Sequence, residues 1–369
     1  MNKRHHILKK ICLWIVGIVV VTVCMAFGVL NYYPSIGKLP SDNDMENYSH
    51  KTDLFYDKTF HNRNDYSLRT GENPPSSDRQ RPSEIIPVNK LTEIPRASST
   101  DFKIVWFGHS SSLLQMGDKN ILIDPILSNR SSPVGFVGPS RFSEIAIEPE
   151  NLPDIDVLFI SHDHYDHLDY KTITTIDSKV SHYIVPLGIE VILKGWGVNP
   201  DKISSLFWWE SVELDGVTYT LTPGQHFSGR NPLRFNATLW GGIHIKNSSH
   251  SFYYTGDGGY TDYFKEVYEK LGEVDLILAE DGQYNKAWAQ THMFPEQTVQ
   301  AAKDVHAKWL IPVHWGAFVL STHAWDDPVV RALQAAQELN VNMATPRIGE
   351  IVDFNEISSY QEHWWEEIE

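Results

Sequence analysis

Cysteine is almost absent from this chain of 369 residues, which contains only Cys12 and Cys24. Both lie in an apolar stretch near the N-terminus, so the rest of the chain can form neither an internal disulfide nor a thiolate metal site. Any metal ligands in the body must therefore be His, Asp or Glu side chains.

Positive charge is also scarce. Lys and Arg number 31 against 47 Asp and Glu, which gives a formal net charge of -16. This charge disfavours unaided binding to nucleic acid or to anionic lipid surfaces, because a polyanion would approach a field of like sign. Hydrophobic residues make up 41% of the chain and charged residues 21%. These fractions are typical of a globular protein that buries a sizeable core.

One long uncharged run, residues 11–30, follows a basic N-terminus over residues 1–10. Twenty helical residues at about 1.5 Å each match a hydrocarbon core of about 30 Å, so we predict a transmembrane anchor. A cleaved signal peptide is the alternative, but the run is longer than a usual signal core and no A-x-A-like site follows it. Basic residues precede the span and predict a cytoplasmic N-terminus with an extracytoplasmic body: Lys3, Arg4, Lys9 and Lys10.

The remaining chain divides by composition into three parts. Residues 31–100 are polar and lack helical or strand periodicity over much of their length, which predicts a tether or surface wrap. Residues 101–355 carry short β-rich runs such as "FKIVWFG" and "DVLFIS", with helix-like segments at 259–271, 295–307 and 328–339. This order predicts an α/β domain with two sheets covered by helices. Residues 356–369 form an acidic C-terminal tail.

The stretch "SHDHYDHLDY" at 161–170 places three histidines and three aspartates directly after the apolar run "IDVLFI". A solvated loop has no reason to favour imidazole, whereas imidazole and carboxylate together are typical of a metal site. Two histidines one residue apart can converge on one ion, and the following Asp and His can face a second. The four candidate ligands are His162, His164, Asp166 and His167.

Three later strands also end on a single ionisable residue. His226 ends "VTYTLTPGQH", Asp257 ends "SFYYTGD" and His314 ends "WLIPVH". Each run is apolar enough to be buried, so each residue is expected at the same edge of the sheets, where loops gather functional groups. The pattern predicts seven ligands for two divalent ions.

These residues resemble the metallo-β-lactamase superfamily, whose signature is HxHxDH followed by His, Asp and His at successive strand ends. The resemblance implies a four-layer αββα sandwich with a binuclear site that usually holds zinc and sometimes manganese or iron. Carried over residue by residue, it implies His162, His164 and His226 at the first metal, Asp166, His167 and His314 at the second, and Asp257 as the bridge.

A narrower resemblance covers residues 80–355. "VWFGHSSSLLQMG", "TPGQHFSGR", "YYTGDGGY" and "IPVHWGAFVLSTHAWDDP" are similar to the branch that contains N-acyl-phosphatidylethanolamine phospholipase D and lies close to the ascorbate-6-phosphate lactonases. It implies a phosphodiesterase that uses a metal-bridging hydroxide on a phospholipid, and the span predicted at 11–30 would anchor this enzyme to the membrane. Two alternatives stay open: hydrolysis of a soluble lactone, ester or cyclic phosphate, and a non-catalytic metal-binding scaffold. The eukaryotic lipase has no N-terminal span such as residues 11–30.

Some residues carry expected roles beyond metal binding. Asp166 and Asp257 are expected to be catalytic because they position the metal pair. His292 is expected to contact a substrate phosphoryl oxygen or protonate the leaving group, and the alternative is a cap partner for the helix that begins at Pro295. His109 is a second candidate for substrate contact or site support, with a structural role as its alternative.

Other residues stay undecided on sequence alone. Asp124 in "LIDPI" is expected either to orient a metal ligand or to serve as a turn residue before a proline. His323 is expected to be structural, and Arg141 and Arg230 could attract an anionic headgroup. Trp364 and Trp365 could pack on the surface or touch lipid.

Overall fold

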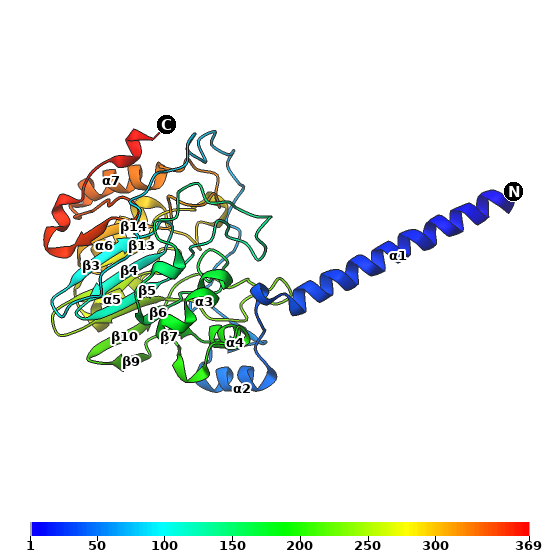
Figure 1. Cartoon of the computed structure of the whole chain (residues 1–369), viewed down its shortest axis with the longest axis horizontal. Helices are drawn as coiled ribbons and strands as arrows, with labels where there is room; N and C mark the ends of the chain where they lie inside the picture. Colours follow the sequence, from blue (N-terminus) through cyan, green and yellow to red (C-terminus); the bar gives the residue numbers. More distant parts are fainter. Residues whose placement is uncertain (1, 369) are drawn as a thin grey trace.

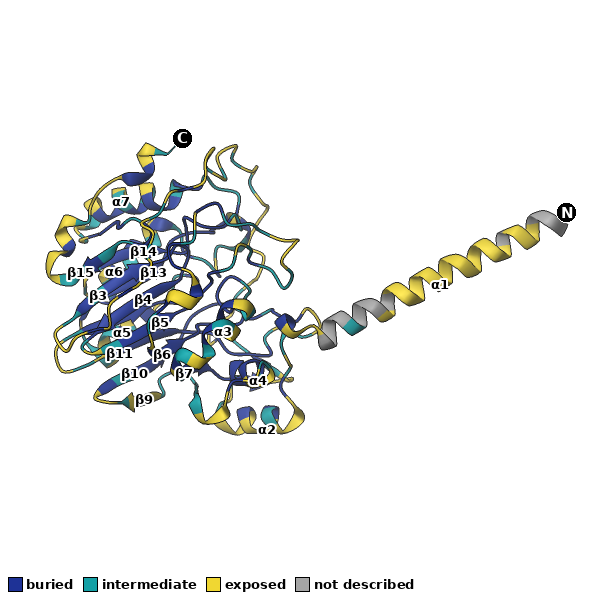
Figure 2. Cartoon of the chain, in the orientation of Figure 1, coloured by how far each residue is buried: buried dark blue, intermediate teal, exposed yellow. Residues whose placement is uncertain are grey.

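The computed structural model describes residues 2–368. Met1 and Glu369, which begin the predicted basic segment and end the predicted acidic tail, lie outside the described residues. Helix α1 (Asn2–Tyr32) projects away from the body, and its described apolar side chains are exposed (Figures 1 and 2). It is long and apolar enough to cross a membrane, a property that signal sequences share. The side chains of Lys3 and Arg4, on which the predicted orientation partly rests, lie outside the described ones.

Among residues 2–368, the strands form one sheet of seven, one of six and a small sheet of two. The seven-stranded sheet is antiparallel across its first part and parallel from β5 to β8. Its strands, in spatial order, are β15 (Ile351–Asp353), β3 (Phe102–Trp106), β4 (Ser112–Met116), β5 (Lys119–Ile123), β6 (Ile155–Phe159), β7 (Val180–Pro186) and β8 (Ile203–Leu206).

The second sheet is also mixed, with antiparallel pairing from β9 to β12 and parallel pairing from β12 to β14. Its strands, in spatial order, are β14 (Ala307–Val313), β13 (Val274–Glu280), β12 (Ser251–Tyr254), β11 (Gly242–Lys246), β10 (Val217–Thr222) and β9 (Ser211–Leu214). Central strands such as β12 are buried along their whole length, which explains why they read as continuous apolar runs.

Helices pack against both sheets, and the chain therefore forms the predicted α/β sandwich (Figure 1). Helix α4 (Ile189–Gly195) packs on β7 and β8, and α6 (Pro295–Asp304) packs on β13 and β14. The predicted helix from 259 begins later, as α5 (Tyr263–Leu271), and the amide of Gly259 donates outside the helix, to the carbonyl of Gln225 at 3.0 Å. The other helices are α3 (Tyr170–Ile176) and α7 (Asp327–Leu339), with short 3₁₀ turns at Pro34–Ile36, Pro149–Asn151, Asp177–Lys179, Pro200–Lys202, Lys286–Trp288, Phe354–Ser359 and Trp364–Glu367.

The two sheets meet through buried aliphatic and aromatic side chains. Phe159 on β6 and Tyr254 on β12 make an edge contact between the sheets, with ring centroids 6.3 Å apart. Both rings are fully buried. Burial of apolar surface on this scale is the main force that holds a sandwich together.

The segment before the first sheet lies against the body. It contains α2 (Asp42–Lys51) and the small hairpin of β1 (Phe55–Tyr56) and β2 (Thr59–Phe60). Ser41 caps α2 through a reciprocal pair of hydrogen bonds with Asp44. Tyr48, Phe55 and Phe60 are buried and form one aromatic cluster.

The C-terminal end also packs onto the body. Trp364 and Trp365 are each about 2% exposed, and both rings contact Trp315. The sequence left their position open, and the structure places them in the core and not at a lipid-facing surface. Acidic residues around them remain in solvent, which explains why this end reads as an acidic tail.

Candidate metal centre

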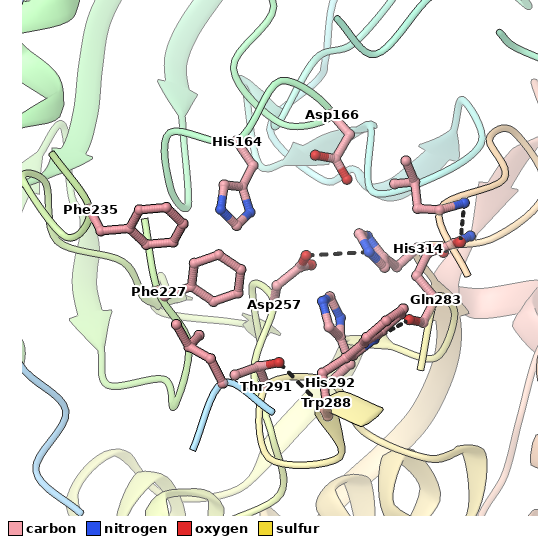
Figure 3. A pocket seen from close by; sticks show the side chains of 12 residues that line it. His164, Asp166, Phe227, Phe235, Asp257, Gln283, Trp288, Thr291, His292 and His314 are labelled. Atoms are coloured by element: carbon pink, nitrogen blue, oxygen red, sulfur yellow. Dashed lines mark hydrogen bonds and ion pairs between the residues drawn. The ribbon is translucent and has the colours of Figure 1, made fainter. Parts of the chain in front are cut away.

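The ionisable residues singled out from the sequence follow strands of both sheets and come together in space. Figure 3 shows four of them, His164, Asp166, Asp257 and His314. The loop after β6 carries His162 to His167. His226 follows β10, Asp257 follows β12 and His314 follows β14. All seven predicted metal ligands therefore lie in one cluster of His and Asp groups.

Three histidines form the first group. Nε2 of His162 lies 2.9 Å from Nδ1 of His164, and Nε2 of His226 lies 3.4 Å from the same nitrogen. Burial, followed by the neighbouring histidines, holds the pKa of His162 and of His226 well below the usual value. Both rings are therefore neutral near pH 7, which is the form that binds a metal ion.

Asp257 lies at the centre of the second group. Its Oδ2 is 3.1 Å from Nε2 of His167, 3.3 Å from Nε2 of His314 and 3.8 Å from Nε2 of His162. One carboxylate oxygen thus faces histidines that were predicted for both metals. Burial raises the pKa of Asp257 to about 6, against the opposing effect of His167.

Asp166 completes the second group. Its Oδ2 lies 3.5 Å from Nε2 of His167. Burial opposes ionisation of Asp166, but His167 and the hydrogen bond with His109 hold its pKa well below the usual range. Asp166 is therefore a carboxylate at neutral pH, whereas Asp257 ionises closer to neutrality.

The donor set fits divalent metal ions. Among the described residues, Nε2 of His167 and Oδ1 of Asp257 are buried and make no hydrogen bond, although buried polar atoms are rarely left unpaired. Imidazole nitrogen and carboxylate oxygen are the ligands that zinc and similar ions prefer when thiolates are absent. A metal ion would satisfy both orphaned atoms.

Asp124 supports this cluster from behind. Its Oδ2 accepts hydrogen bonds from Nδ1 of His167 at 2.7 Å and from the hydroxyl of Tyr254 at 2.7 Å, and its Oδ1 accepts from the amide of Ser161 at 2.7 Å. The His167 contact fixes that ring so that Nε2 faces Asp257. Asp124 also adopts a left-handed backbone with φ of 39°, so the two expected roles coincide at this residue.

His109 lies beside the second group and not in the cavity. Its Nε2 is 2.8 Å from Oδ2 of Asp166, and its ring is fully buried against His314 with centroids 4.1 Å apart. It does not line the pocket described below. His109 instead shares a group of possible metal ligands with Asp166, His167 and His314, so its contact with substrate remains a prediction.

A cavity of about 320 Å³ opens beside the cluster (Figure 3). Its polar floor includes Asp257, His292 and His314, and apolar side chains form much of its wall. The lining residues are Leu68, His164, Asp166, Phe227, Phe235, Asp257, Gln283, Trp288, Thr291, His292, His314 and Leu320.

His292 reaches this cavity with one ring nitrogen already engaged. Its Nδ1 lies 2.9 Å from Oε1 of Glu280, so Nε2 is the nitrogen left for the cavity. At the start of the helix that follows, the amide of Phe294 donates to Oε1 of Gln297 at 3.0 Å, whereas the ring of His292 is bonded to Glu280. Burial lowers the pKa of His292, which favours a neutral ring.

Glu280 is a site residue that the sequence analysis missed. It is fully buried, and its carboxylate accepts hydrogen bonds from the amides of Gly258 and Met293 as well as from His292. Burial raises its pKa well above the usual value, although the two amides oppose this. The available signal was its place at the end of the apolar run "DLILAE", the rule that identified Asp257.

The remaining candidates have structural contacts. His323 accepts a hydrogen bond from the amide of Gln283 at 2.9 Å and stacks on Tyr284. Arg141 donates to the carbonyl of Ile126. Arg230 is buried, and it donates to backbone carbonyls and not towards solvent, so it is not a headgroup site.

Comparison with known proteins places these residues in a family. Residues 119–315 match the family described as beta-lactamase superfamily domain. A protein of unknown function from Mycobacterium tuberculosis is 40% identical over 277 residues, which are 74% of this chain and 74% of that protein. The N-acyl-phosphatidylethanolamine-hydrolyzing phospholipase D 1 of Caenorhabditis elegans is 32% identical over 298 residues, which are 76% of this chain and 83% of the enzyme.

A solved structure supports the fold alone. A possible metal-dependent hydrolase from Veillonella parvula aligns with a TM-score of 0.54 at 17% identity, over 69% of this chain and 100% of that chain.

Proposed function

Because the chain belongs to the metallo-β-lactamase superfamily of metal-dependent hydrolases, we propose that it is a membrane-anchored phosphodiesterase of N-acyl-phosphatidylethanolamine phospholipase D type. One observation carries this proposal. Two groups of possible ligands, one with His162, His164 and His226 and the other with Asp166, His167 and His314, lie around Asp257, which lines a cavity with apolar walls. The phospholipase relative from Caenorhabditis elegans supports the choice of a phosphodiester.

Two divalent ions, preferably Zn²⁺, fit the clustered donors. We assign His162, His164 and His226 to the first ion, Asp166, His167 and His314 to the second, and Asp257 to both. When bound, such ions activate water at neutral pH and offset the negative charge that develops during hydrolysis. Mn²⁺ and Fe²⁺ accept the same ligand types.

The side chains around the ions have separate roles in binding and proton transfer. Asp166 stays ionised and is oriented by His109, so it presents a fixed charge. His292 has Nδ1 held by Glu280, and this leaves Nε2 to bind a phosphoryl oxygen or to move a proton to the leaving oxygen. We therefore assign catalytic roles to Asp166, Asp257 and His292.

The walls of the cavity suit a substrate with an apolar substituent. Phe227 and Phe235 stack with ring centroids 5.9 Å apart on one side, and Leu68, Trp288 and Leu320 contribute further apolar surface. Burial of acyl methylenes against such walls is favourable by about 0.8 kcal/mol each. This surface favours a lipid over a fully polar phosphodiester.

Helix α1 supports attachment to a membrane. Its exposed apolar side chains would be stabilised by lipid, and a span next to the catalytic domain confines the enzyme to the surface that carries its substrate. The basic residues before the span favour an extracytoplasmic domain.

Product analysis by mass spectrometry tests the proposal. The purified full chain is incubated with N-acyl-phosphatidylethanolamine in mixed micelles, with and without a chelator. We expect phosphatidic acid that disappears when the metal is removed. No product from protein that carries two metals would reject the phospholipase assignment.

A small soluble substrate is the second candidate, because a cavity of about 320 Å³ holds little more than a small molecule. The same assay with lactones and cyclic phosphates separates the two functions. Turnover that needs no micelle would favour the soluble substrate.

A further inference from the structure

Residues 59–70 cross the open edge of the candidate metal centre, although they precede both the predicted hydrolase domain at 101–355 and the family match at 119–315. We propose that this segment is part of the catalytic site, that Asn62 positions His226 for its metal, and that Leu68 limits the substituent that the cavity accepts. The inference rests on the proposed metal site.

The segment is anchored on both sides of Asn62. Before it, Phe60 is fully buried against Phe55, with ring centroids 4.7 Å apart, and its amide donates to the carbonyl of Asn236 at 2.8 Å. After it, Arg63 makes two hydrogen bonds to Glu266 at 2.8 and 2.9 Å. These contacts leave Asn62 little freedom to move relative to the body.

Asn62 makes a reciprocal pair of hydrogen bonds with the backbone of His226. Its Nδ2 donates to the carbonyl of His226 at 2.8 Å, and its Oδ1 accepts from the amide of His226 at 3.2 Å. Asn62 is only 9% exposed. Among residues 2–368, no other backbone group bonds the amide or carbonyl of His226, so the side chain of Asn62 takes the place of a neighbouring strand.

The imidazole of His226 is fixed from its other side. Its Nδ1 lies 2.9 Å from the carbonyl of Thr291, which assigns Nδ1 as the donor and leaves Nε2 for the metal. The ring direction therefore depends on two contacts, Asn62 at the backbone and Thr291 at the ring. Contacts of this kind around a metal ligand set its orientation and affinity.

The same segment also holds the loop that carries Thr291 and His292. The amide of Ser67 donates to Oε1 of Gln290 at 2.7 Å. Thr70 donates through its amide to Ala287 at 2.7 Å, and its hydroxyl donates to the carbonyl of Lys286 at 2.6 Å. Residues 59–70 thus connect the His226 turn to the loop at 286–292.

Leu68 lies in the sequence between Ser67 and Thr70, which are both bonded to the loop at 286–292, and it lines the cavity. It is 44% exposed, so its position is not explained by core packing. An exposed side chain that lines the cavity restricts what enters. Shortening it widens the cavity without touching a metal ligand.

Zinc affinity of the full chain in detergent, measured by competition with a fluorescent chelator, tests the role of Asn62. We expect Asn62→Ala to weaken zinc binding by about tenfold and to lower the unfolding temperature of the metal-free protein no more than Asn120→Ala does. Asn120→Ala is the matched control, because Asn120 is buried and bonded to the carbonyl of Asp154 but lies in β5, away from the metal groups. It should lower stability and keep zinc affinity.

Thr70→Val serves if Asn62→Ala does not fold, because it removes only the hydroxyl contacts of an exposed residue. We expect Thr70→Val to weaken zinc binding two- to threefold. Leu68→Ala should keep zinc affinity and change KM for acyl substrates by about tenfold with little change in kcat.

The outcomes separate this inference from the proposed function. Zinc affinity equal to wild type in both Asn62→Ala and Thr70→Val, or an unchanged KM in Leu68→Ala, would overturn the inference and leave the metal site intact. A wild-type chain that binds no zinc would overturn both.

Discussion

Oε1 of Glu280 lies 2.9 Å from Nδ1 of His292, at the end of a buried strand and at the floor of the cavity. Glu280 also accepts a hydrogen bond from the amide of Met293. One carboxylate therefore fixes both the ring of His292 and the backbone next to it. The pair determines which nitrogen of His292 faces the cavity.

Removal of Glu280 is therefore expected to slow catalysis through His292. Glu280→Ala should lower kcat by about 100-fold, the range that general acid–base catalysis supplies. Glu280→Gln keeps one acceptor oxygen and should retain more activity than Glu280→Ala. Steady-state kinetics on variants with measured metal content test this, and a kcat within twofold of wild type at full metal loading would contradict it.

Asp257 is expected to matter more for turnover than for stability. Asp257→Asn should lower turnover by at least about 100-fold and reduce the bound metal from two ions towards one. Because burial raises the pKa of Asp257 to about 6, its ionised form is unfavourable in the metal-free protein at pH 7, and Asn removes that cost. Calorimetry of the metal-free variant should show an unfolding temperature no lower than wild type. Normal turnover would remove Asp257 from the bridging role.

Asp124 is expected to act on metal affinity. Asp124→Asn replaces one acceptor oxygen that now serves His167, Ser161 or Tyr254, and we expect metal to bind about 10- to 100-fold more weakly. Tyr254→Phe removes only one of these contacts and should have a smaller effect. Equilibrium dialysis against zinc buffers measures both, and equal affinities in all three proteins would show that Asp124 acts only as a turn residue.

Glu190 provides a pH test away from the metal centre. Burial raises the pKa of Glu190, which accepts hydrogen bonds from the hydroxyl of Tyr48 and the amide of Gly188. The folded state then binds this proton more tightly than the unfolded state, so the contribution of Glu190 to stability is full below pH 4.5 and falls as pH rises through the folded pKa. The slope is at most about 1.4 kcal/mol per pH unit.

Glu190→Gln should remove this slope, because the amide is neutral and can still accept from Gly188 and donate to Tyr48. Urea unfolding of wild type and variant between pH 4.5 and 7.5 gives the comparison. We expect the variant to gain stability relative to wild type as pH rises, and a constant difference would contradict the raised pKa.

Helix α1 is expected to remain attached and to place the domain outside the cytoplasm. In intact bacterial cells that express the full chain, added protease should digest the body while a cytoplasmic control protein survives. N-terminal sequencing of the membrane fraction separates an anchor, which keeps residues 1–30, from a cleaved signal. A body protected until the cells are lysed would reverse the proposed topology.

Several features were predicted from the sequence for a local reason. The runs that end on His162, His226, Asp257 and His314 read as buried strands, and residues that end buried strands collect at a sheet edge. Their side-chain types then indicate metal binding without knowledge of any long-range contact. The same rule applies to Glu280, which ends the buried run "DLILAE".

Other features depended on packing between distant parts of the chain. His109 reads as a strand-end residue with access to substrate, but the fold turns it onto Asp166 and away from the cavity. Trp364 and Trp365 stand in an acidic sequence, yet the body leaves room for them beside Trp315. Sequence periodicity predicts neither the contact of His109 nor the burial of the two tryptophans. Both depend on which surface of the folded body is left uncovered by other elements.

The sequence by itself determined the strands, their apolar faces and the chemistry of the cluster, because alternation, turn residues and ligand types act over a few neighbouring residues. The tertiary structure alone decided which nitrogens face one another and which segment closes the cavity. Asn62 and His226 are 164 positions apart and are joined by two hydrogen bonds. Such a contact depends on how whole elements pack, and no local pattern encodes it.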